Sequence, residues 1–453
     1  MKRVKNRALA ALLLVAAAIV GIGVYIIRFA EDGERWATEA VNPFVYSGGS
    51  LVVGTLTDRN GVTLAEITDG RRTFAESADV RRATLHAVGD AQGFIGTGAL
   101  SVFAPQLAGY NAITGAYSRT GEGGTVALTV DLRLNVEAMR ALDGRRGAVM
   151  VMDYTTGEVL CMVSGPTFDA NSPPRVVDGD PAFEGIYLNR ALSAAYTPGS
   201  TFKLLTAAAA IENIDGISER KFDCKGSISV GDGTINCPRA HGEVSFGQAL
   251  AVSCNGMFAE LSLELGADTL ARYVKMYGFS ESTTVGGVTT AKGSFDKAEP
   301  GTDALAWSGI GQYTNTVCPA AMLRFVGAVA NGGMAVPMRL TQKTGAALFT
   351  PGERLMKSDT AERLGEMMNF NVSESYGEKN FPGLTLHAKS GTAEVGGDAS
   401  PHAWFTGYIS NEGCPLAFVV VIENGGGGAA AAGPVANRVL QAALLFLEPV
   451  EGE

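Results

Sequence analysis

Pro198-Gly199-Ser200-Thr201-Phe202-Lys203 opens an apolar run that reaches Ile211. Proline and glycine interrupt any preceding helix, so the pattern predicts a helix from Ser200 to about Ile211. Three residues make about one helical turn, so the Ser200 and Lys203 side chains share a face and can meet. A serine hydroxyl needs an adjacent base to become a nucleophile. Because apolar neighbours would bury the amine and lower its pKa, Lys203 is the candidate for that base.

This four-residue pattern is short, and taken alone it is better explained as a helix start with an exposed lysine. A second motif, Ser253-Cys254-Asn255, adds a hydroxyl that could relay a proton and an amide that can both donate to and accept from a peptide bond. In an extended segment Cys254 would point away from both neighbours, as a packed thiol. An ordinary turn would also explain this motif.

The third motif is Lys389-Ser390-Gly391-Thr392, directly after the strand-like run Leu384–Ala388. A lysine and two hydroxyls at a strand edge suit a ligand that bears a carboxylate. Gly391 would let that ligand approach the backbone and pair with the strand. A turn at the strand end with a solvated lysine is the alternative.

The pattern around these motifs predicts an α/β architecture of the layered α+β kind, with a central antiparallel sheet flanked by helices. A hairpin is predicted from two strands at Ala148–Asp153 and Glu158–Ser164, and further strands at Ala403–Ile409 and Leu416–Glu423. Helices dominate between the hairpin and about residue 335. After a flexible loop at Gly425–Gly433, a last helix runs from Pro434 to about Leu447.

The N-terminus predicts a membrane anchor. Basic residues precede an uncharged apolar run from Ala8 to Ile27, which is long enough to cross the hydrocarbon core. The basic flank favours a cytoplasmic N-terminus. A cleaved signal peptide is the alternative, but Tyr25–Arg28 is a poor cleavage site. We therefore expect a cytoplasmic tail (1–7), a transmembrane anchor (8–27), a small β-rich pedestal module (28–143) without a long helix before Leu132, and a catalytic domain (144–453).

Composition excludes some functions and leaves the cysteines open. The net charge of -10 and the lack of a long basic run argue against a nucleic-acid partner. Cys224 and Cys237 flank a predicted turn and could form a disulfide outside the membrane. A metal site that uses Cys224, Cys237 and His241 and a set of free thiols are the alternatives. Cys161 and Cys414 lie in or beside strand-like runs and are expected to be buried.

The three motifs occur in the order that is the signature of the penicillin-binding protein and serine β-lactamase superfamily, which the chain resembles from Gly147 to its C-terminus. Other stretches that resemble the family are Asn189-Arg190-Ala191, Tyr196-Thr197-Pro198-Gly199-Ser200 and Gly309-Ile310-Gly311-Gln312. Gly54–Ala65 resembles the first pedestal motif of class B members, although Val53 stands where arginine is usual. The chain has no room for a class A glycosyltransferase domain.

The resemblance implies a peptidoglycan D,D-transpeptidase that β-lactams acylate at Ser200. It implies Lys203 as general base, Ser253 as proton relay, Asn255 as substrate anchor and Lys389 as the group that holds the local field. Ser390 and Thr392 would bind the terminal carboxylate, Gly391 would belong to the same substrate-binding segment, and the backbone N–H groups of Ser200 and Thr392 would form the oxyanion hole. No cofactor or metal is implied, and a SEDS-type membrane glycosyltransferase is the expected partner. The alternatives are a D,D-carboxypeptidase, a β-lactamase, and a structural or sensor component of a cell-wall complex.

Overall fold

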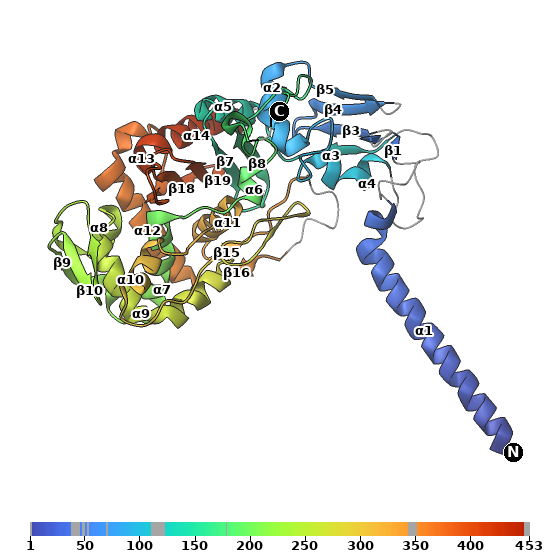
Figure 1. Cartoon of the computed structure of the whole chain (residues 1–453), viewed down its shortest axis with the longest axis horizontal. Coiled ribbons are helices and arrows are strands. Elements are labelled where there is room, and N and C mark those ends of the chain that lie inside the picture. The colour runs from blue at the N-terminus through green and yellow to red at the C-terminus, as the bar shows by residue number, and fades with distance from the viewer. Residues whose placement is uncertain are drawn as a thin grey trace.

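A long helix, a small mixed module and a larger layered domain follow one another along the chain (Figure 1). The computed structural model describes residues 2–37, 46–47, 50–51, 54–68, 71–109, 123–177, 179–342 and 351–447. Val53, the expected departure from the pedestal motif, lies outside these residues.

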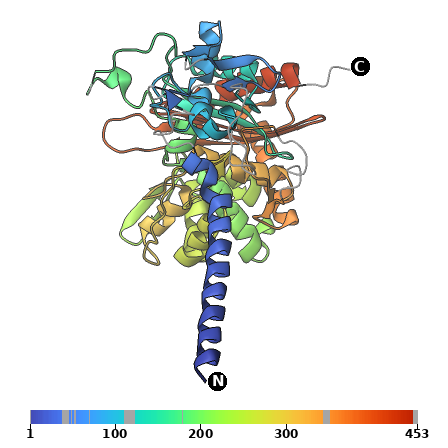
Figure 2. The same cartoon turned by 90° about the vertical axis from the view of Figure 1, so that its right-hand side faces the viewer.

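Helix α1 (Lys2–Ala37) projects away from the rest of the protein (Figure 2). Its apolar part, Arg3–Phe29, lies outside the packed core and is long and apolar enough to cross a membrane. Among the described residues it is the one such helix. The observed helix therefore contains the whole of the predicted anchor, 8–27.

The module after α1 is built on a four-stranded sheet in the order β5-β4-β3-β6, in which the β3–β6 pair is parallel. Its strands are β3 (Gly54–Thr57), β4 (Thr63–Thr68), β5 (Arg71–Phe74) and β6 (Thr125–Ala127), and two short strands, β1 (Tyr46–Ser47) and β2 (Ser50–Leu51), pair separately. Its helices are α2 (Ala78–Val88), α3 (Ala99–Val102) and α4 (Ala104–Leu107).

Helix α2 corrects the expectation that no long helix precedes Leu132. Ser77 caps it by accepting a hydrogen bond from the backbone N–H of Val80. In the first half of the helix, Arg81 has a largely buried side chain and forms an ion pair with Asp169 in the larger domain. The charged residues of the helix, Asp79, Arg81 and Arg82, weaken its apolar periodicity, so the sequence pattern alone does not predict it.

The larger domain contains a five-stranded antiparallel sheet in the order β17-β18-β19-β7-β8. Its strands are β7 (Gly147–Asp153), β8 (Val159–Gly165), β17 (Leu386–Ala393), β18 (His402–Asn411) and β19 (Cys414–Ile422). The predicted hairpin, the return of the chain to the sheet and the layered architecture are therefore confirmed.

Both faces of this sheet are buried, as the continuous apolar runs of β7 and β19 require. On β19, Val419 belongs to the core beneath helix α11 (Pro319–Ala330), whereas Val420 belongs to the core on the opposite face. That second core lies beneath α5 (Leu132–Leu142) and α14 (Gly433–Leu447). The short helix α13 (Gly428–Ala431) replaces part of the flexible loop that was expected at Gly425–Gly433.

Besides α11, the described chain between β8 and β17 carries six α-helices and eight short strands, so strands interrupt a region that helices were expected to dominate. The helices are α6 (Arg190–Ser193), α7 (Lys203–Asn213), α8 (Phe246–Ala251), α9 (Asn255–Met276), α10 (Asp303–Ile310) and α12 (Ser358–Asn371). The strands are β9 (Lys221–Cys224), β10 (Ser227–Val230), β11 (Gly233–Asn236) and β12 (Gly242–Ser245), and the predicted turn at Val230–Gly233 closes the β10–β11 hairpin. Two further two-residue pairs are β13 (Thr284–Val285) with β14 (Val288–Thr289) and β15 (Met334–Ala335) with β16 (Glu353–Arg354).

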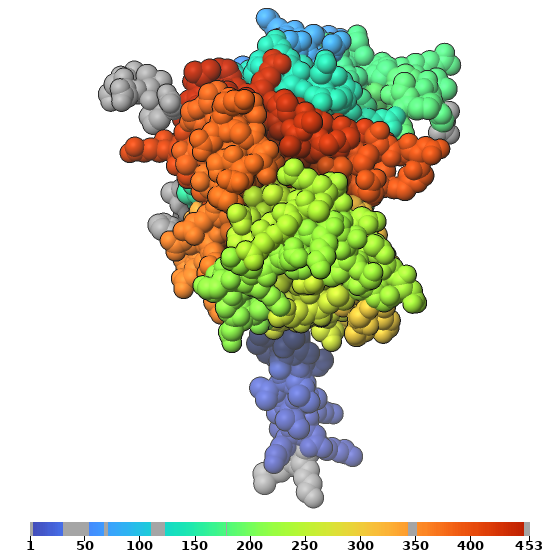
Figure 3. Space-filling view, turned by 90° about the vertical axis from the view of Figure 1, so that its left-hand side faces the viewer, coloured from blue at the N-terminus to red at the C-terminus, as the bar shows by residue number. Residues whose placement is uncertain are grey.

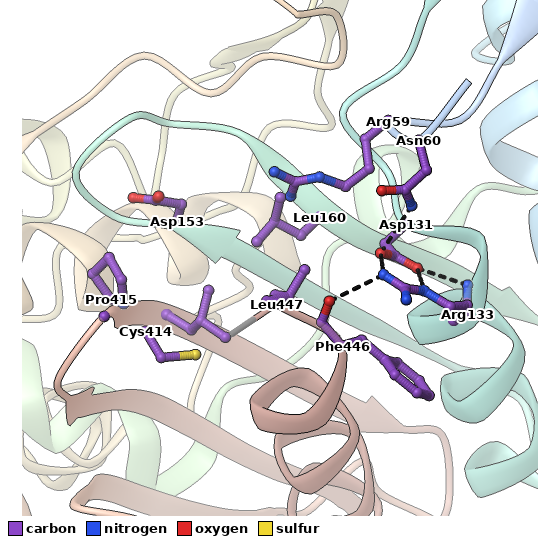
Figure 4. A pocket seen from close by; sticks show the side chains of 12 residues that line it. Arg59, Asn60, Asp131, Arg133, Asp153, Leu160, Cys414, Pro415, Phe446 and Leu447 are labelled. Carbon is purple, nitrogen blue, oxygen red and sulfur yellow. Dashed lines mark hydrogen bonds and ion pairs between the residues drawn. The ribbon is translucent and has the colours of Figure 1, made fainter. Parts of the chain in front are cut away.

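A polar pocket of about 220 Å³ marks the junction between the module and the larger domain (Figure 4). Arg133 donates to Asp131 at 2.6 Å and to the backbone oxygen of Phe446 at 3.0 Å. Asn60 donates to the same Asp131 carboxylate at 3.2 Å. The charges of Arg59, Asp131 and Arg133 are paired within the protein, so we assign the pocket the role of joining the pedestal motif to α5 and α14.

The domain boundary predicted at 143/144 stays a prediction. Helix α5 lies on the N-terminal side of that boundary, yet Leu134 and Ala138 belong to the core shared with α14. The module and the domain therefore share packing, through α5 and also through α2, which contacts β8.

Candidate functional site

Ser200 lies on a tight turn rather than on the first turn of an α-helix. Residues Gly199–Phe202 form a 3-10 helix, η2, and the α-helix α7 begins at Lys203. Gly199 has a φ of 52°, and a Cβ there would lie 2.6 Å from the backbone oxygen of Thr392. Glycine is therefore required at this position, and it brings the Ser200 turn against strand β17.

Lys203 is fully buried and its amine meets only neutral groups of the 253–255 segment. Its Nζ lies 2.7 Å from the backbone oxygen of Ser253, 3.1 Å from Ser253 Oγ and 2.7 Å from Asn255 Oδ1. The ring of Phe258 lies below the amine, with its centroid 5.6 Å away. No carboxylate offsets the burial of this cation among these partners.

Burial is the main cause that lowers the pKa of Lys203, to about 7. Nearby thiols act in the opposite direction and do not restore the usual value. An amine with such a pKa is neutral in a substantial fraction of molecules at neutral pH, so it can accept a proton.

Ser253 occupies a strained backbone conformation, with a φ of 55°. A non-glycine residue in this left-handed region costs about 1–3 kcal/mol, which the surrounding structure must offset. The turn joins α8 to α9 and directs Ser253 Oγ to a point between two lysines. Lys389 Nζ donates to that oxygen at 3.2 Å, in addition to the contact from Lys203.

Lys389 is also fully buried, and burial together with the positive charge of Lys203 holds its pKa well below the usual range. It lies within strand β17, because the strand continues to Ala393 instead of ending at the predicted Ala388. Strand β17 is at the edge of the five-stranded sheet. An edge strand has backbone groups that an extended peptide can pair with.

Gly391 has a different neighbour from the one expected. A Cβ at this position would lie 2.7 Å from the backbone oxygen of Pro198 and 3.0 Å from Thr201 Cγ2. The lack of a side chain therefore admits the Ser200 turn at this point.

Ser390 is held by Tyr376, a residue that the sequence patterns did not single out. The Tyr376 hydroxyl accepts a hydrogen bond from the Ser390 N–H at 2.8 Å and lies 3.1 Å from Ser390 Oγ. Tyr376 ends η5 (Val372–Tyr376), which follows α12 with π-helical geometry. Thr392 Oγ1 in turn accepts a hydrogen bond from the N–H of Gly428 at 3.1 Å.

An open cleft of about 460 Å³ collects these groups. Figure 3 shows the face on which the yellow-green segment of β9–β12 adjoins the orange-red segment that carries β17. Five of the predicted site residues line the cleft: Ser200, Ser253, Asn255, Ser390 and Thr392. The two lysines lie buried and reach the cleft through Ser253.

The lining includes residues beyond the three motifs, namely Asn236, Cys237, Pro238, Trp307, Ile310, Gln312 and Glu394. Three of them carried a signal: Cys237 as a disulfide or metal candidate, and Ile310 and Gln312 as part of a stretch noted for its family resemblance. The others lie on loops and on α10, where no local pattern distinguishes a cleft residue from an ordinary surface residue.

All six cysteines are free thiols in the structure, so of the alternatives left open for Cys224 and Cys237 the disulfide is not the one observed. Their sulfurs lie 3.6 Å apart. Cys254 is buried, as expected of a packed thiol, and its sulfur lies 3.9 Å from that of Cys237. Cys161 and Cys414 are buried, as expected.

Known proteins resemble the chain over most of its length. Residues 147–441 match the family described as "Penicillin binding protein transpeptidase domain". A protein named "Peptidoglycan D,D-transpeptidase PbpA" from Mycobacterium tuberculosis is 28% identical over 366 residues, which are 72% of this chain and 74% of that protein. The protein of the same name from Mycolicibacterium smegmatis is 29% identical over 365 residues, with 72% and 74% covered.

A solved structure agrees with this. The ceftriaxone acyl-enzyme complex of penicillin-binding protein A from M. tuberculosis superposes with a TM-score of 0.75 at 25% identity. The match covers 86% of this chain and 98% of that chain.

Proposed function

The chain belongs to the penicillin-binding protein transpeptidase family, as a class B member, and from this premise we propose how it acts as a peptidoglycan D,D-transpeptidase. The observation that carries the proposal is the buried Lys203 amine. It is one turn from Ser200 and is hydrogen-bonded only to neutral groups beside the cleft. Such an amine suits a general base for a serine nucleophile.

In the acylation half-reaction, Ser200 Oγ attacks the carbonyl carbon of the penultimate D-Ala of a stem peptide. The hydroxyl proton passes to neutral Lys203 as the Oγ–C bond forms. The backbone N–H groups of Ser200 and Thr392 stabilise the negative oxygen of the tetrahedral intermediate, and each such donor contributes about 3–4 kcal/mol to lowering the barrier. The C–N bond then breaks, and the leaving D-Ala nitrogen receives the proton from Lys203 through Ser253.

In the second half-reaction, an amine of another stem attacks the Ser200 ester. Lys203 accepts the proton of that amine, the new amide bond forms, and the proton returns to Ser200 Oγ as the ester bond breaks. Asn255 anchors the substrate amide, Lys389 holds the local field around Ser253, and Ser390 and Thr392 bind the terminal carboxylate of the donor. The donor peptide pairs with the edge strand β17.

We further propose that α1 holds the protein in the cell membrane with its basic N-terminus in the cytoplasm and the cleft outside. The anchor and the pedestal motif would then contact a SEDS-type glycosyltransferase that supplies the glycan strand. The support for the orientation is the excess of lysine and arginine before the apolar run.

The test of this function is covalent labelling of the full-length protein by a fluorescent penicillin. We expect the wild-type chain and a Ser229→Ala control, which changes an exposed serine on β10, to take one label per chain. Ser200→Ala should take none. A wild-type protein that is folded but takes no label would overturn the proposal, and label on Ser200→Ala would show that another residue is the nucleophile.

The fate of the acyl group separates the transpeptidase from its alternatives. A donor peptide ending in D-Ala-D-Ala is incubated with and without a D-amino acid as acceptor amine. We expect the exchange product to exceed the hydrolysis product when the amine is present. Hydrolysis alone would indicate a carboxypeptidase, and fast loss of the penicillin label would indicate a β-lactamase.

A further inference from the structure

Four side chains from four separate segments bring soft metal-ligand atoms together beside the cleft. Cys224 ends β9, Cys237 follows β11, His241 precedes β12, and Cys254 caps α9. Their three sulfur atoms and one imidazole nitrogen all lie within 4.8 Å of one another. Cys224 and Cys254 are buried, whereas Cys237 and His241 are half-buried.

The distances between neighbouring atoms match the edges of a zinc tetrahedron. Bond lengths of about 2.3 Å for Zn–S and about 2.0 Å for Zn–N give S···S edges of roughly 3.8 Å and S···N edges of roughly 3.5 Å. The sulfur of Cys237 lies 3.6 Å from that of Cys224 and 3.9 Å from that of Cys254. Cys224 Sγ lies 3.4 Å from His241 Nδ1.

We propose that Cys224, Cys237, His241 and Cys254 bind one structural Zn²⁺ ion. Three thiolates and one imidazole complete a tetrahedral set and leave no open position, which is typical of structural and not catalytic zinc. A disulfide between any two of the cysteines would account for two of the converging groups and leave the other two unexplained. Zinc accounts for all four.

The surrounding backbone supports thiolate ligands. The N–H of Gly256, in the first turn of α9, donates to Cys237 Sγ at 3.3 Å. The loop that carries His241 is fixed by a hydrogen bond of 3.1 Å from its own N–H to the backbone oxygen of Cys224. Such outer hydrogen bonds orient ligands and stabilise the charge on sulfur.

The zinc ion would affect the catalytic cleft by fixing the position of the segment that contacts the Lys203 amine. Cys254 stands between Ser253 and Asn255, which hold the Lys203 amine. Asn255 Nδ2 also donates to the backbone oxygen of Asn236 at 2.7 Å, and Asn236 and Cys237 line the cleft. The ion therefore ties one wall of the cleft to the strained Ser253 turn.

The direct test is the metal content of the full-length chain, purified in detergent without chelators and incubated with equimolar Zn²⁺ before gel filtration. We expect about one zinc per chain, and the absorption of tetrahedral Co²⁺–thiolate after exchange with cobalt. We also expect six titratable thiols when the protein is unfolded in chelator without reductant. A folded protein that retains no zinc, or that shows four thiols, would overturn the proposal.

Matched variants assign the ligands. His241→Ala should weaken zinc binding by about 100-fold or more, since even outer-shell losses cost about 10–100-fold. His241→Cys should retain one zinc, because thiolate can replace imidazole in such a set. Cys161→Ser changes a buried cysteine outside the cluster and should retain the ion. Equal zinc affinity in wild type and His241→Ala would contradict the proposed site.

The zinc measurement tests the metal site, and the penicillin labelling tests the proposed function, so each proposal can be overturned without the other. Loss of zinc with retention of penicillin label on Ser200 is compatible with the proposed function, and a zinc-bound chain without label is compatible with the metal site. We expect His241→Ala to be labelled several-fold more slowly than His241→Cys. Equal labelling rates would remove the positioning role from the ion.

Discussion

Among the buried cations of the larger domain, Arg190 and Lys203 have opposite surroundings. Arg190 on α6 is 2% exposed and donates to the Glu423 carboxylate at 2.7 Å. Tyr196 donates to the same carboxylate oxygen at 2.7 Å. Lys203 on α7 is 0% exposed and has only neutral acceptors. The Arg190 guanidinium is therefore paired with a carboxylate, whereas the Lys203 amine has no negatively charged group among its hydrogen-bond partners.

The partners of a buried cation decide whether it stabilises the fold as half of an ion pair or can serve as a base. Burial raises the pKa of the Glu423 carboxyl, but the hydrogen bonds from Tyr196 and Arg190 together hold it below its usual value. The charged pair is therefore maintained and joins α6 to the sheet. At Lys203 burial outweighs the opposite effect of the nearby thiols, so the pKa falls to about 7. A carboxylate beside Lys203 would restore the charge and remove the base.

The largest effect is expected on the rate of acylation, when Lys203 is replaced by arginine, the residue type of the structural ion pair. Lys203→Arg places a group that is always protonated where a proton acceptor is needed. We expect the second-order rate constant for penicillin acylation to fall by about 10²–10⁴-fold, the usual contribution of general-base catalysis. Thermal unfolding serves as the control for folding. A folded variant that acylates within tenfold of wild type would show that Lys203 is not the base.

Breaking the structural pair should affect stability instead. Glu423→Gln leaves the Arg190 charge buried without its carboxylate, so we expect the free energy of unfolding to fall by about 3–5 kcal/mol. The control is Glu243→Gln, which removes an exposed ion pair with Lys221 and should cost less than about 1 kcal/mol. Urea unfolding of both variants measures the difference, and equal losses would contradict the contrast drawn here.

The smallest effect is expected at Tyr376, which acts on the site through Ser390. Tyr376→Phe removes a net hydrogen-bond contribution of about 1 kcal/mol, so acylation should slow by about fivefold. Because Ser390 is assigned to carboxylate binding, we expect the change in KM for a donor peptide and not in kcat. A change confined to kcat would assign Tyr376 to the proton path.

Much of the fold and of the candidate site could be predicted from the sequence, because each motif places its reactive side chains within a few residues of one another. Ser200 and Lys203 are one turn apart, so their proximity follows from helical geometry. The β7–β8 hairpin and the return of β18 and β19 were predicted because their apolar runs end at turn residues. The family and the layered fold followed from the order of the motifs.

What could not be predicted depends on contacts between distant segments. Tyr376 contacts Ser390 from a π-helical turn that has no sequence signature. Cys254 Sγ lies 3.9 Å from Cys237 Sγ, next to Ser253, whose left-handed conformation departs from the extended segment that the sequence suggests. The strand that carries Lys389 runs on to Ala393 because it pairs with β18 along its whole length, and that pairing is not encoded locally.

The most direct test of a neutral Lys203 as base is the pH dependence of acylation of the full-length chain by benzylpenicillin, whose carboxylate stays ionised over the range used. The second-order rate constant reports the pKa of the free enzyme. Since the neutral amine is the active form, the rate constant should rise with pH, reach half its maximum near pH 7 and level off above it. A rate constant that is independent of pH from about 5 to 9, or that rises only near the ordinary lysine pKa of about 10.4, would contradict the account.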